Sequence, residues 1–378
     1  MVRTVGVEEE LLLFDPGSWE VVAAAPAVLK EFREHGAGRR PPRTATDELD
    51  QELFRHQLEI RTDPATELDD VLGQVLAARR TAGVAARAVD LRIGACGIVP
   101  LGGDRSVVSP NDRYRDMVEA FGEVARTGGT CGMHVHTAIE SDEEGVAVLD
   151  RIAPWLPVLL ALSANSPYVD GRDSGYASWR AQVWQRWPSA GPTEQFGSVA
   201  GYRSAARALL DSGAARDVGM LYFDARLSES QPTVEVRVCD VCTDPGLASA
   251  IVALARALVE SAARHWRSGQ ALPRWRAEAL RAAHWRAARY GMADALVHPA
   301  TARLAPARQV LDALVAWTRP ALAEAGDLEP VEAVAQRSVS DNGATRQRAA
   351  FERTGDLGAV VDDLVARTEA SWQHPELA

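Results

Sequence analysis

Three short segments of the 378-residue chain alternate apolar and ionisable residues, which is the period of a β-strand. Because alternate side chains of a strand point to the same side, each segment has one mainly apolar face, which in the first segment also carries Glu9, and one face with two ionisable groups. These pairs are Glu8 with Glu10, His134 with His136, and Glu235 with Arg237. The pattern predicts one sheet with an apolar back and a front face that collects charge.

The rest of the chain predicts a mixture of strands and helices. Strands are expected at residues 2–14, 19–23, 58–61, 91–98, 132–139, 219–226 and 233–239, and helices at 26–34, 65–89, 111–126 and 142–164. From residue 245 the pattern is almost all helical, with breaks near Pro273, Pro299, Pro320 and Pro330. Since strands do not alternate strictly with single helices, we expect the α+β class and not a doubly wound sheet.

One stretch, residues 165–195, reads as a long loop rich in Trp, Tyr and Arg. A structureless segment of this length inside a compact domain is usually functional or disordered. The aromatic and basic composition favours a functional loop.

The charge balance excludes several classes of protein. Lys and Arg number 41 against 52 Asp and Glu, giving a net charge of −11, and Lys30 is the only lysine. A phosphate loop of the Walker type needs a lysine after its glycines, and no such motif occurs. The acidic surplus argues against nucleic acid or an anionic membrane as a partner. With no signal-peptide pattern and four scattered cysteines, we expect a cytoplasmic protein.

The acidic pairs indicate a metal site. Carboxylates that crowd together raise each other's pKa unless a cation lies among them. Oxygen-rich ligation with an imidazole suits Mg²⁺ or Mn²⁺ better than zinc. The alternative is that each charged face simply meets solvent, which is routine in antiparallel sheets.

Glu52 and Glu59 form a weaker candidate pair. They are seven residues apart, so a regular strand would place them on opposite faces. They converge only if Glu52 precedes the strand or a bulge intervenes. From spacing alone, unrelated surface acids remain the simpler interpretation.

An ordered set of motifs resembles a known family over nearly the whole chain. The segments are residues 6–10 (GVEEE), 131–136 (CGMHVH), 165–168 (NSPY), 177–180 (ASWR), 233–240 (TVEVRVCD), 289–291 (RYG) and 342–344 (NGA). In order and spacing they are similar to carboxylate–amine ligases related to glutamate–cysteine ligase, the type 2 or YbdK-like group.

The resemblance implies a glutamine-synthetase-like catalytic fold, in which a curved, mainly antiparallel sheet forms an open funnel backed by helices. We expect a single catalytic domain over residues 1–378, with the sheet and interleaved helices in 1–243 and a helical part in 244–378. The implied reaction is ATP-dependent ligation of glutamate to an amine, by default cysteine, through an acyl phosphate that releases ADP and phosphate.

The resemblance also assigns site residues. The implied metal ligands are Glu8, Glu10, Glu52, Glu59, His134 and Glu235, holding Mg²⁺ or Mn²⁺. Arg237 and Arg180 are candidate catalytic groups, with Arg237 and Arg289 toward ATP and with Arg172, Arg180, Tyr168 and Trp179 toward the substrates. His136 is either a further ligand or a hydrogen-bonded neighbour of the ligands.

Three other readings stay open at the level of the sequence. The acceptor could be an amine other than cysteine. The His134/His136 pair could belong to a metal-dependent amide hydrolase, although such a barrel expects strict strand–helix alternation. The chain could also be a non-catalytic relative that binds glutamate or nucleotide. Cys239 and Cys242 read as inert buried thiols, and a homodimer is the default assembly.

Overall fold

One antiparallel sheet organises the molecule. The computed structural model describes residues 2–34, 44–103, 107–127, 129–272, 274–338 and 341–373. The strands of the sheet are β1 (Val5–Phe14), β2 (Asp50–Gln51), β3 (Gln57–Arg61), β4 (Arg92–Gly94), β5 (Gly132–Ala138), β8 (Ala225–Leu227) and β9 (Thr233–Asp240). Their order is β2-β3-β1-β5-β9-β8, and β4 pairs with the end of β1. The three strands predicted from alternation, β1, β5 and β9, therefore lie side by side in its centre.

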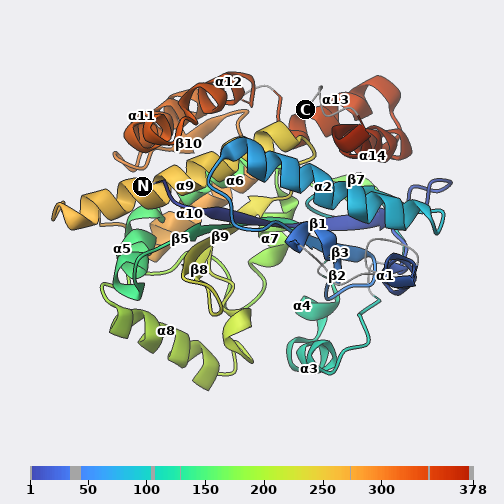
Figure 1. The fold of residues 1–378 in the computed structure, drawn as a ribbon, viewed down its shortest axis with the longest axis horizontal. Coiled ribbons are helices and arrows are strands. Elements are labelled where there is room, and N and C mark those ends of the chain that lie inside the picture. Colours follow the sequence, from blue (N-terminus) through green and yellow to red (C-terminus); the bar gives the residue numbers. More distant parts are fainter. Residues whose placement is uncertain are drawn as a thin grey trace.

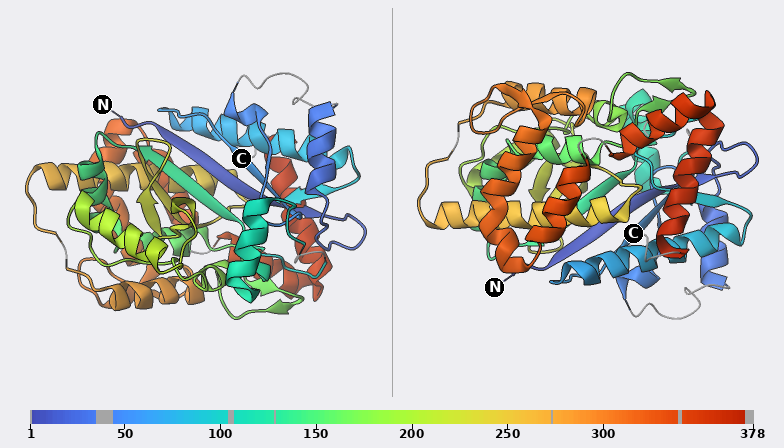
Figure 2. Two further views of the ribbon diagram at one scale, coloured as in Figure 1. Left: turned by 90° about the horizontal axis from the view of Figure 1, so that it is seen from below. Right: turned by 90° about the horizontal axis from the view of Figure 1, so that it is seen from above.

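Helices cover the back of this sheet and flank its front. They are α1 (Ala25–Glu34), α2 (Leu68–Arg87), α3 (Asp112–Phe121), α4 (Glu123–Arg126), α5 (Asp142–Ile152), α6 (Leu156–Ser163), α7 (Trp179–Trp184), α8 (Val199–Asp211), α9 (Pro245–Arg267), α10 (Ala277–Tyr290), α11 (Ala307–Ala325), α12 (Leu328–Ser338), α13 (Gly343–Thr354) and α14 (Leu357–Gln373). In Figure 1, α2 and α9 lie above the sheet while α3, α4 and α8 lie below it. Seen from below, the strands are visible between α8 and α3 (Figure 2, left), so this face is the open one.

Helix α9 is the central helix of the core. Its N-cap, Asp244, accepts hydrogen bonds from the N–H groups of Gly246 and Leu247, and Pro245 occupies the first turn. By length and composition α9 could cross a membrane, and the pair α5–α6, bent by 69°, passes the same test together. However, 89% of the apolar window of α9 is buried inside the fold, which is typical of a core helix.

The back face of β1 contains a buried carboxylate that forms an ion pair with a buried arginine. Glu9 points away from Glu8 and Glu10 and meets Arg79 of α2, and both side chains are buried. Arg79 donates from Nε and Nη2 to the two carboxylate oxygens of Glu9, at 2.7 Å each. It also donates to the carbonyl oxygens of Cys242 and Thr243. This pair ties β1 and α2 to the chain that follows β9.

Several local predictions were wrong. Residues 165–195 are not a plain loop, because they form the hairpin β6 (Tyr168–Val169) and β7 (Arg172–Asp173) and then α7, which Ser178 caps. Helix α8 was not predicted, and the strand expected at 219–226 is mainly a 3₁₀ turn (Val218–Met220) followed by β8.

In the C-terminal part, the predicted break near Pro299 is a hairpin of β10 (Ala295–Val297) and β11 (Leu304–Pro306). Pro320 lies inside α11 and does not end it. Thr318, Ala321 and Leu322 around it are buried, so packing offsets the lost backbone hydrogen bond. Pro330 lies in the first turn of α12, close to the expected break. The break predicted near Pro273 falls on a residue outside the described ranges.

Candidate active site

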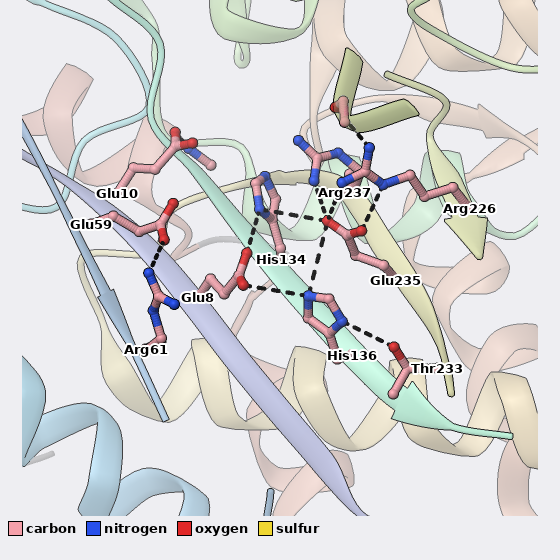
Figure 3. A network of polar contacts seen from close by, with 12 residues as sticks. Glu8, Glu10, Glu59, Arg61, His134, His136, Arg226, Thr233, Glu235 and Arg237 are labelled. Carbon is pink, nitrogen blue, oxygen red and sulfur yellow. Dashed lines mark hydrogen bonds and ion pairs between the residues drawn. The ribbon is translucent and has the colours of Figure 1, made fainter. Parts of the chain in front are cut away.

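The strand register brings the predicted polar residues onto one face. Glu8 of β1 is opposite His134 of β5, and Glu10 is opposite Glu59 of β3. On the other side of β5, His136 is opposite Glu235 of β9. Paired residues of neighbouring strands share a face. Four strands thus deliver acids and imidazoles to the open front of the sheet (Figure 3).

The first group of ligating atoms lies between β1, β5 and β9. His134 Nδ1 is 3.2 Å from Glu8 Oε2 and 3.9 Å from Glu235 Oε1. His136 Nε2 is 3.6 Å from Glu8 Oε1 and 3.9 Å from Glu235 Oε1. One ligand atom each from Glu8, His136 and Glu235 lie within 4.8 Å of one another. That spacing leaves room for a cation between them.

His136 fits the role of a metal ligand better than the sequence alone indicated. Its Nε2 is buried without a hydrogen-bond partner, although it faces two carboxylates. Its other nitrogen, Nδ1, lies 3.0 Å from the hydroxyl of Thr233, which fixes the ring orientation. An oriented imidazole with a free nitrogen toward carboxylates is what a divalent cation requires, so the residues present fit a metal.

Two arginines hold Glu235 in its charged form. Arg237 and Arg226 both donate to its carboxylate, with Arg226 Nε at 2.7 Å from Oε2. Burial opposes ionisation, yet the guanidinium of Arg237 and then that of Arg226 lower the pKa of Glu235 to about 2. Burial and Arg237 also lower the pKa of His134 to about 4, which keeps it neutral and able to ligate. Arg226 was not predicted from the sequence.

The second group consists of buried carboxylates with too few cations. Burial raises the pKa of Glu10 to about 7, although Arg180 and the Gly132 N–H favour the charged form. Burial and the charge of Glu10 raise the pKa of Glu52, and burial and the charge of Glu52 raise that of Glu59. The shifts match the expectation that crowded acids protonate unless a cation lies among them. Glu10, Glu52 and Glu59 therefore form a second cluster of carboxylates, whose negative charge a divalent cation would offset.

The convergence of Glu52 and Glu59 follows from the position of Glu52. It lies after β2 and before β3, so it is not bound to the alternation of β3. Its side chain shares a hydrogen bond with that of Glu59. Of the two ways in which the pair could converge, the protein uses the position before the strand.

A bulge between β5 and β9 sets the face that Glu235 and Arg237 occupy. Met133 pairs with Cys239 but Val135 pairs with Val236, so β9 has one extra residue between these pairs. With a regular register, Glu235 and Arg237 would point to the core side. The extra residue turns both side chains to the front.

Gly132 allows Arg180 to approach the site. A Cβ at this position would collide with the Arg180 guanidinium and would lie 3.3 Å from His134 Nε2. The Gly132 N–H donates to Glu10 Oε2 at 2.6 Å. Arg180 itself is buried, donates to the carbonyls of Arg237 and Val238, and lies 3.9 Å from Asp240. Through these contacts Arg180 supports β9, the strand that carries Arg237, on the side away from the cavity.

A cavity of about 260 Å³ lies in front of the two groups. Its lining includes Glu8, Glu10, Glu52, Glu59, His134 and Arg237 from the predicted site, and Arg113, Tyr114, Trp184, Trp187, Tyr222 and Arg226, which were not predicted. Trp184 and Trp187 belong to the aromatic stretch that was interpreted as functional. The composition of that stretch therefore indicated a functional segment correctly, but the residues predicted from it were Tyr168 and Trp179.

The other residues assigned to substrates or ATP lie elsewhere. Tyr168 is buried against Phe351 at 5.5 Å between rings, and Trp179 packs on Tyr176 at 5.1 Å. Arg172 is exposed in the β6–β7 hairpin. Arg289 lies over the rings of Tyr176 and Tyr290 at 5.3 and 5.1 Å. None of these four residues lines the cavity, so the geometry does not favour these roles, which stay predictions.

Comparison with known proteins identifies the family. Residues 4–363 match the model described as glutamate-cysteine ligase family 2. A Nocardioides sp. protein, provisionally named glutamate–cysteine ligase 2-1, is 74% identical over 99% of this chain and 98% of its own length. A Streptomyces coelicolor protein, provisionally named glutamate–cysteine ligase 2, is 46% identical over 98% of this chain and 100% of its own length.

Solved structures share the fold at low sequence identity. Glutamate–cysteine ligase from Francisella tularensis, in complex with AMP, has a TM-score of 0.66 and 13% identity over 100% of this chain and 90% of its own. A bifunctional glutathione synthetase from Pasteurella multocida has a TM-score of 0.69 and 16% identity over 100% of this chain and 53% of its own. The expected glutamine-synthetase-like α+β fold is confirmed. With its family model matched over nearly its whole length, this chain belongs to glutamate–cysteine ligase family 2 and is a ligase that forms a C–N bond.

Proposed function

We propose that the protein is an ATP-dependent carboxylate–amine ligase that joins the γ-carboxylate of glutamate to an amine. The γ-carboxylate takes the terminal phosphoryl group of ATP, giving ADP and γ-glutamyl phosphate. The amine then attacks the acyl carbon, phosphate leaves, and a γ-glutamyl amide remains. Cysteine is the reference acceptor, because the names of the relatives indicate it.

The observation that supports this proposal most directly is that two clusters of carboxylate side chains and two arginines lie together on one sheet face. Glu8, His134, His136 and Glu235 would hold one cation, and Glu10, Glu52 and Glu59 another. Divalent cations bound there would neutralise the phosphate oxygens and align ATP with glutamate.

Arg237 and Arg226 are placed to hold the phosphoryl group during its transfer. Both contact Glu235, so the three groups together keep one net positive charge. The Nε of Arg237 is buried without a hydrogen-bond partner. A planar guanidinium with an unused donor suits the oxygens of a phosphoryl group in flight. We assign Arg237 as the catalytic residue and Arg180 as a positioning residue behind it.

The two other classes of function have less support. A barrel hydrolase using His134 and His136 expects parallel strands alternating with helices, whereas these histidines lie on an antiparallel strand. A non-catalytic relative would not need a competent ligand at each expected metal position. Neither reading accounts for Arg226 and Arg237 beside the carboxylates.

The test is nucleotide turnover with trapping of the intermediate. The protein is incubated with ATP, Mg²⁺ and glutamate, with and without a panel of amines, and ADP and γ-glutamyl products are quantified. Hydroxylamine, a small nucleophile, should trap γ-glutamyl phosphate as the hydroxamate. Product formed without ATP, or no ADP and no hydroxamate under any condition, would refute the proposal. Arg237→Lys should lower the rate of hydroxamate formation, because an ammonium lacks the planar fork.

A further inference from the structure

One arginine of the cavity lining belongs neither to the carboxylate clusters nor to the pair of arginines at Glu235. Arg113 of α3 lines the cavity together with Tyr114 and Tyr222. Its Nε and Nη2 lie 2.9 and 3.1 Å from the two carboxylate oxygens of Asp217, which fixes the plane of the guanidinium. Its third nitrogen, Nη1, donates no hydrogen bond to the described part of the chain.

Asp217 is held in place from its other side. Its Oδ1 accepts the N–H of Met220 and caps the 3₁₀ turn that leads into Tyr222. The guanidinium is therefore anchored to a fixed acid, while 45% of the Arg113 side chain is open to solvent. An anchored guanidinium with a donor to spare can bind a second carboxylate without releasing the first.

Arg113 lies one turn of the chain away from the arginines at Glu235. Arg226 Nη1 donates to the Gly219 carbonyl at 2.8 Å, and a Cβ added to Gly219 would lie 3.4 Å from Arg113 Nη2. Both arginines line the same cavity. A short molecule that reacts beside Arg237 can therefore place a carboxylate at Arg113.

The proposed reaction leaves one kind of substrate group unassigned. Arg226 and Arg237 are assigned to the phosphoryl group, and the lining glutamates are assigned to divalent cations that offset their charge. Glutamate also has an α-carboxylate, and an amino-acid acceptor has a carboxylate beside its amine. Burial raises the pKa of Tyr222 to about 12, so its phenol keeps its proton as a further donor in this cavity.

We propose that Arg113 recognises the carboxylate of an amino-acid substrate through Nη1, while Asp217 holds its other two nitrogens. The inference rests on the proposed function and names a specificity-determining residue for it. The same group has two sources, the α-carboxylate of the donor glutamate and the carboxylate of the acceptor, and the experiment separates them. Because the contact lies away from the reacting atoms, its loss should raise KM more than it lowers kcat.

A second ion pair between the same two segments provides the matched control. Arg216 Nε and Nη2 lie 2.8 and 2.7 Å from the carboxylate oxygens of Asp116 in α3. The side chains of Arg113 and Arg216 are similarly exposed, at 45% and 48%, yet of the two only Arg113 lines the cavity. Arg113→Met and Arg216→Met therefore remove equivalent exposed ion pairs, and both should change the melting temperature little.

Pairs of substrates that differ in one carboxylate test the proposal. For the donor, glutamate is compared with 4-aminobutyrate, which lacks the α-carboxylate, and the hydroxamate formed with hydroxylamine is quantified. For the acceptor, cysteine is compared with cysteamine and alanine with ethylamine, with glutamate as the donor. We expect kcat/KM to favour the member with the carboxylate in at least one pair by about tenfold or more, the scale of a hydrogen bond to a charged group.

Arg113→Met should lower that ratio by about tenfold or more, mainly through KM, whereas Arg216→Met should leave it unchanged. Arg113→Lys should lower it as well, because an ammonium lacks the planar fork that serves two carboxylates at once. A fall in the donor ratio identifies glutamate as the source of the carboxylate, and a fall in an acceptor ratio identifies the acceptor.

Three results would overturn the inference while leaving the proposed function intact. The first is the absence of any preference within the pairs in the unaltered protein. The second is an unchanged ratio in Arg113→Met, and the third is an equal fall in Arg216→Met, which would show a structural role only. Absence of ADP and of hydroxamate in the unaltered protein would instead refute the proposed function and, with it, this inference.

Discussion

Neighbouring glutamates on the two faces of β1 have opposite electrostatic surroundings. On the back, Glu9 has one cation, Arg79, which contacts both of its oxygens in a fully buried pair. On the front, Glu10 lies with Glu52 and Glu59, and burial raises the pKa of all three. The back acid is neutralised by a fully buried arginine, whereas of the three front acids only Glu59 has an ion pair with a described residue, at 3.0 Å to the partly exposed Arg61. The difference separates a residue that maintains the fold from residues that we propose to take part in the chemistry.

The largest effect should follow a change on the front face. Glu10→Gln removes a negative charge from the second metal group and should lower kcat for ADP formation by about 10²–10³-fold, the scale of losing one electrostatic contribution to a transition state. Its amide oxygen can still accept the Gly132 N–H, so the melting temperature of the metal-free protein should not fall. Steady-state kinetics and thermal denaturation measure both. Near-wild-type turnover would show that Glu10 is not part of the active site.

The matching change on the back face should act on stability. Arg79→Met leaves Glu9 buried without its cation and should lower the free energy of unfolding by about 3–5 kcal/mol. The kcat of the folded protein should fall far less than in Glu10→Gln. Urea denaturation and active-site titration of the soluble fraction test this. A loss of activity without a loss of stability would show that the two faces are not separate in role.

Removing both members of the back pair should restore part of that loss. Glu9→Leu combined with Arg79→Met replaces a buried ion pair with apolar side chains, a change that is often close to neutral. We expect the double variant to be more stable than Arg79→Met alone, and a double-mutant cycle measures the coupling. If the two losses simply add, Glu9 and Arg79 are not a coupled pair.

The smallest expected effect is a pH dependence of metal stabilisation. In the metal-free protein the protonated form of Glu10 is favoured, so its contribution to stability is present below pH 4.5 and is lost as the pH rises to about 7. A divalent cation needs the carboxylates ionised. The rise in melting temperature caused by Mg²⁺ should therefore be larger at pH near 7.5 than near 5.5. Glu10→Gln should flatten this dependence, and an equal rise at both values would contradict it.

The sequence predicted the central strands and their charged face because alternation is a local property. Glu8, His134 and Glu235 meet because β1, β5 and β9 are neighbours, as their apolar backs required. For Glu52, spacing pointed the wrong way, because a turn before β3 is not visible in a count of residues. The family resemblance placed Glu52 in the predicted site, which periodicity could not do.

The aromatic part of the cavity lining was not predictable from local pattern. Tyr114, Trp184 and Tyr222 come from three segments far apart in the chain, and only the folded arrangement of α3, α7 and the 3₁₀ turn brings them together. Tyr168 and Trp179 lie in the same aromatic stretch as Trp184 and Trp187, yet they pack on Phe351 and Tyr176 and do not line the cavity. Aromatic content indicates buried surface area, and the topology decides which rings face the cavity.

The bulge in β9 changes which alternate residues of the strand face the front of the sheet. Asp240, beyond the bulge, and Glu235, before it, have opposite parity in the sequence, yet both serve the polar side of the sheet. An insertion or deletion before the bulge therefore cannot replace one after it, because the two change the orientation of different side chains. A single-residue deletion at the bulge would leave every strand in place while exchanging the inner and outer residues of half of β9. The number of residues in this strand is thus as constrained as their identity.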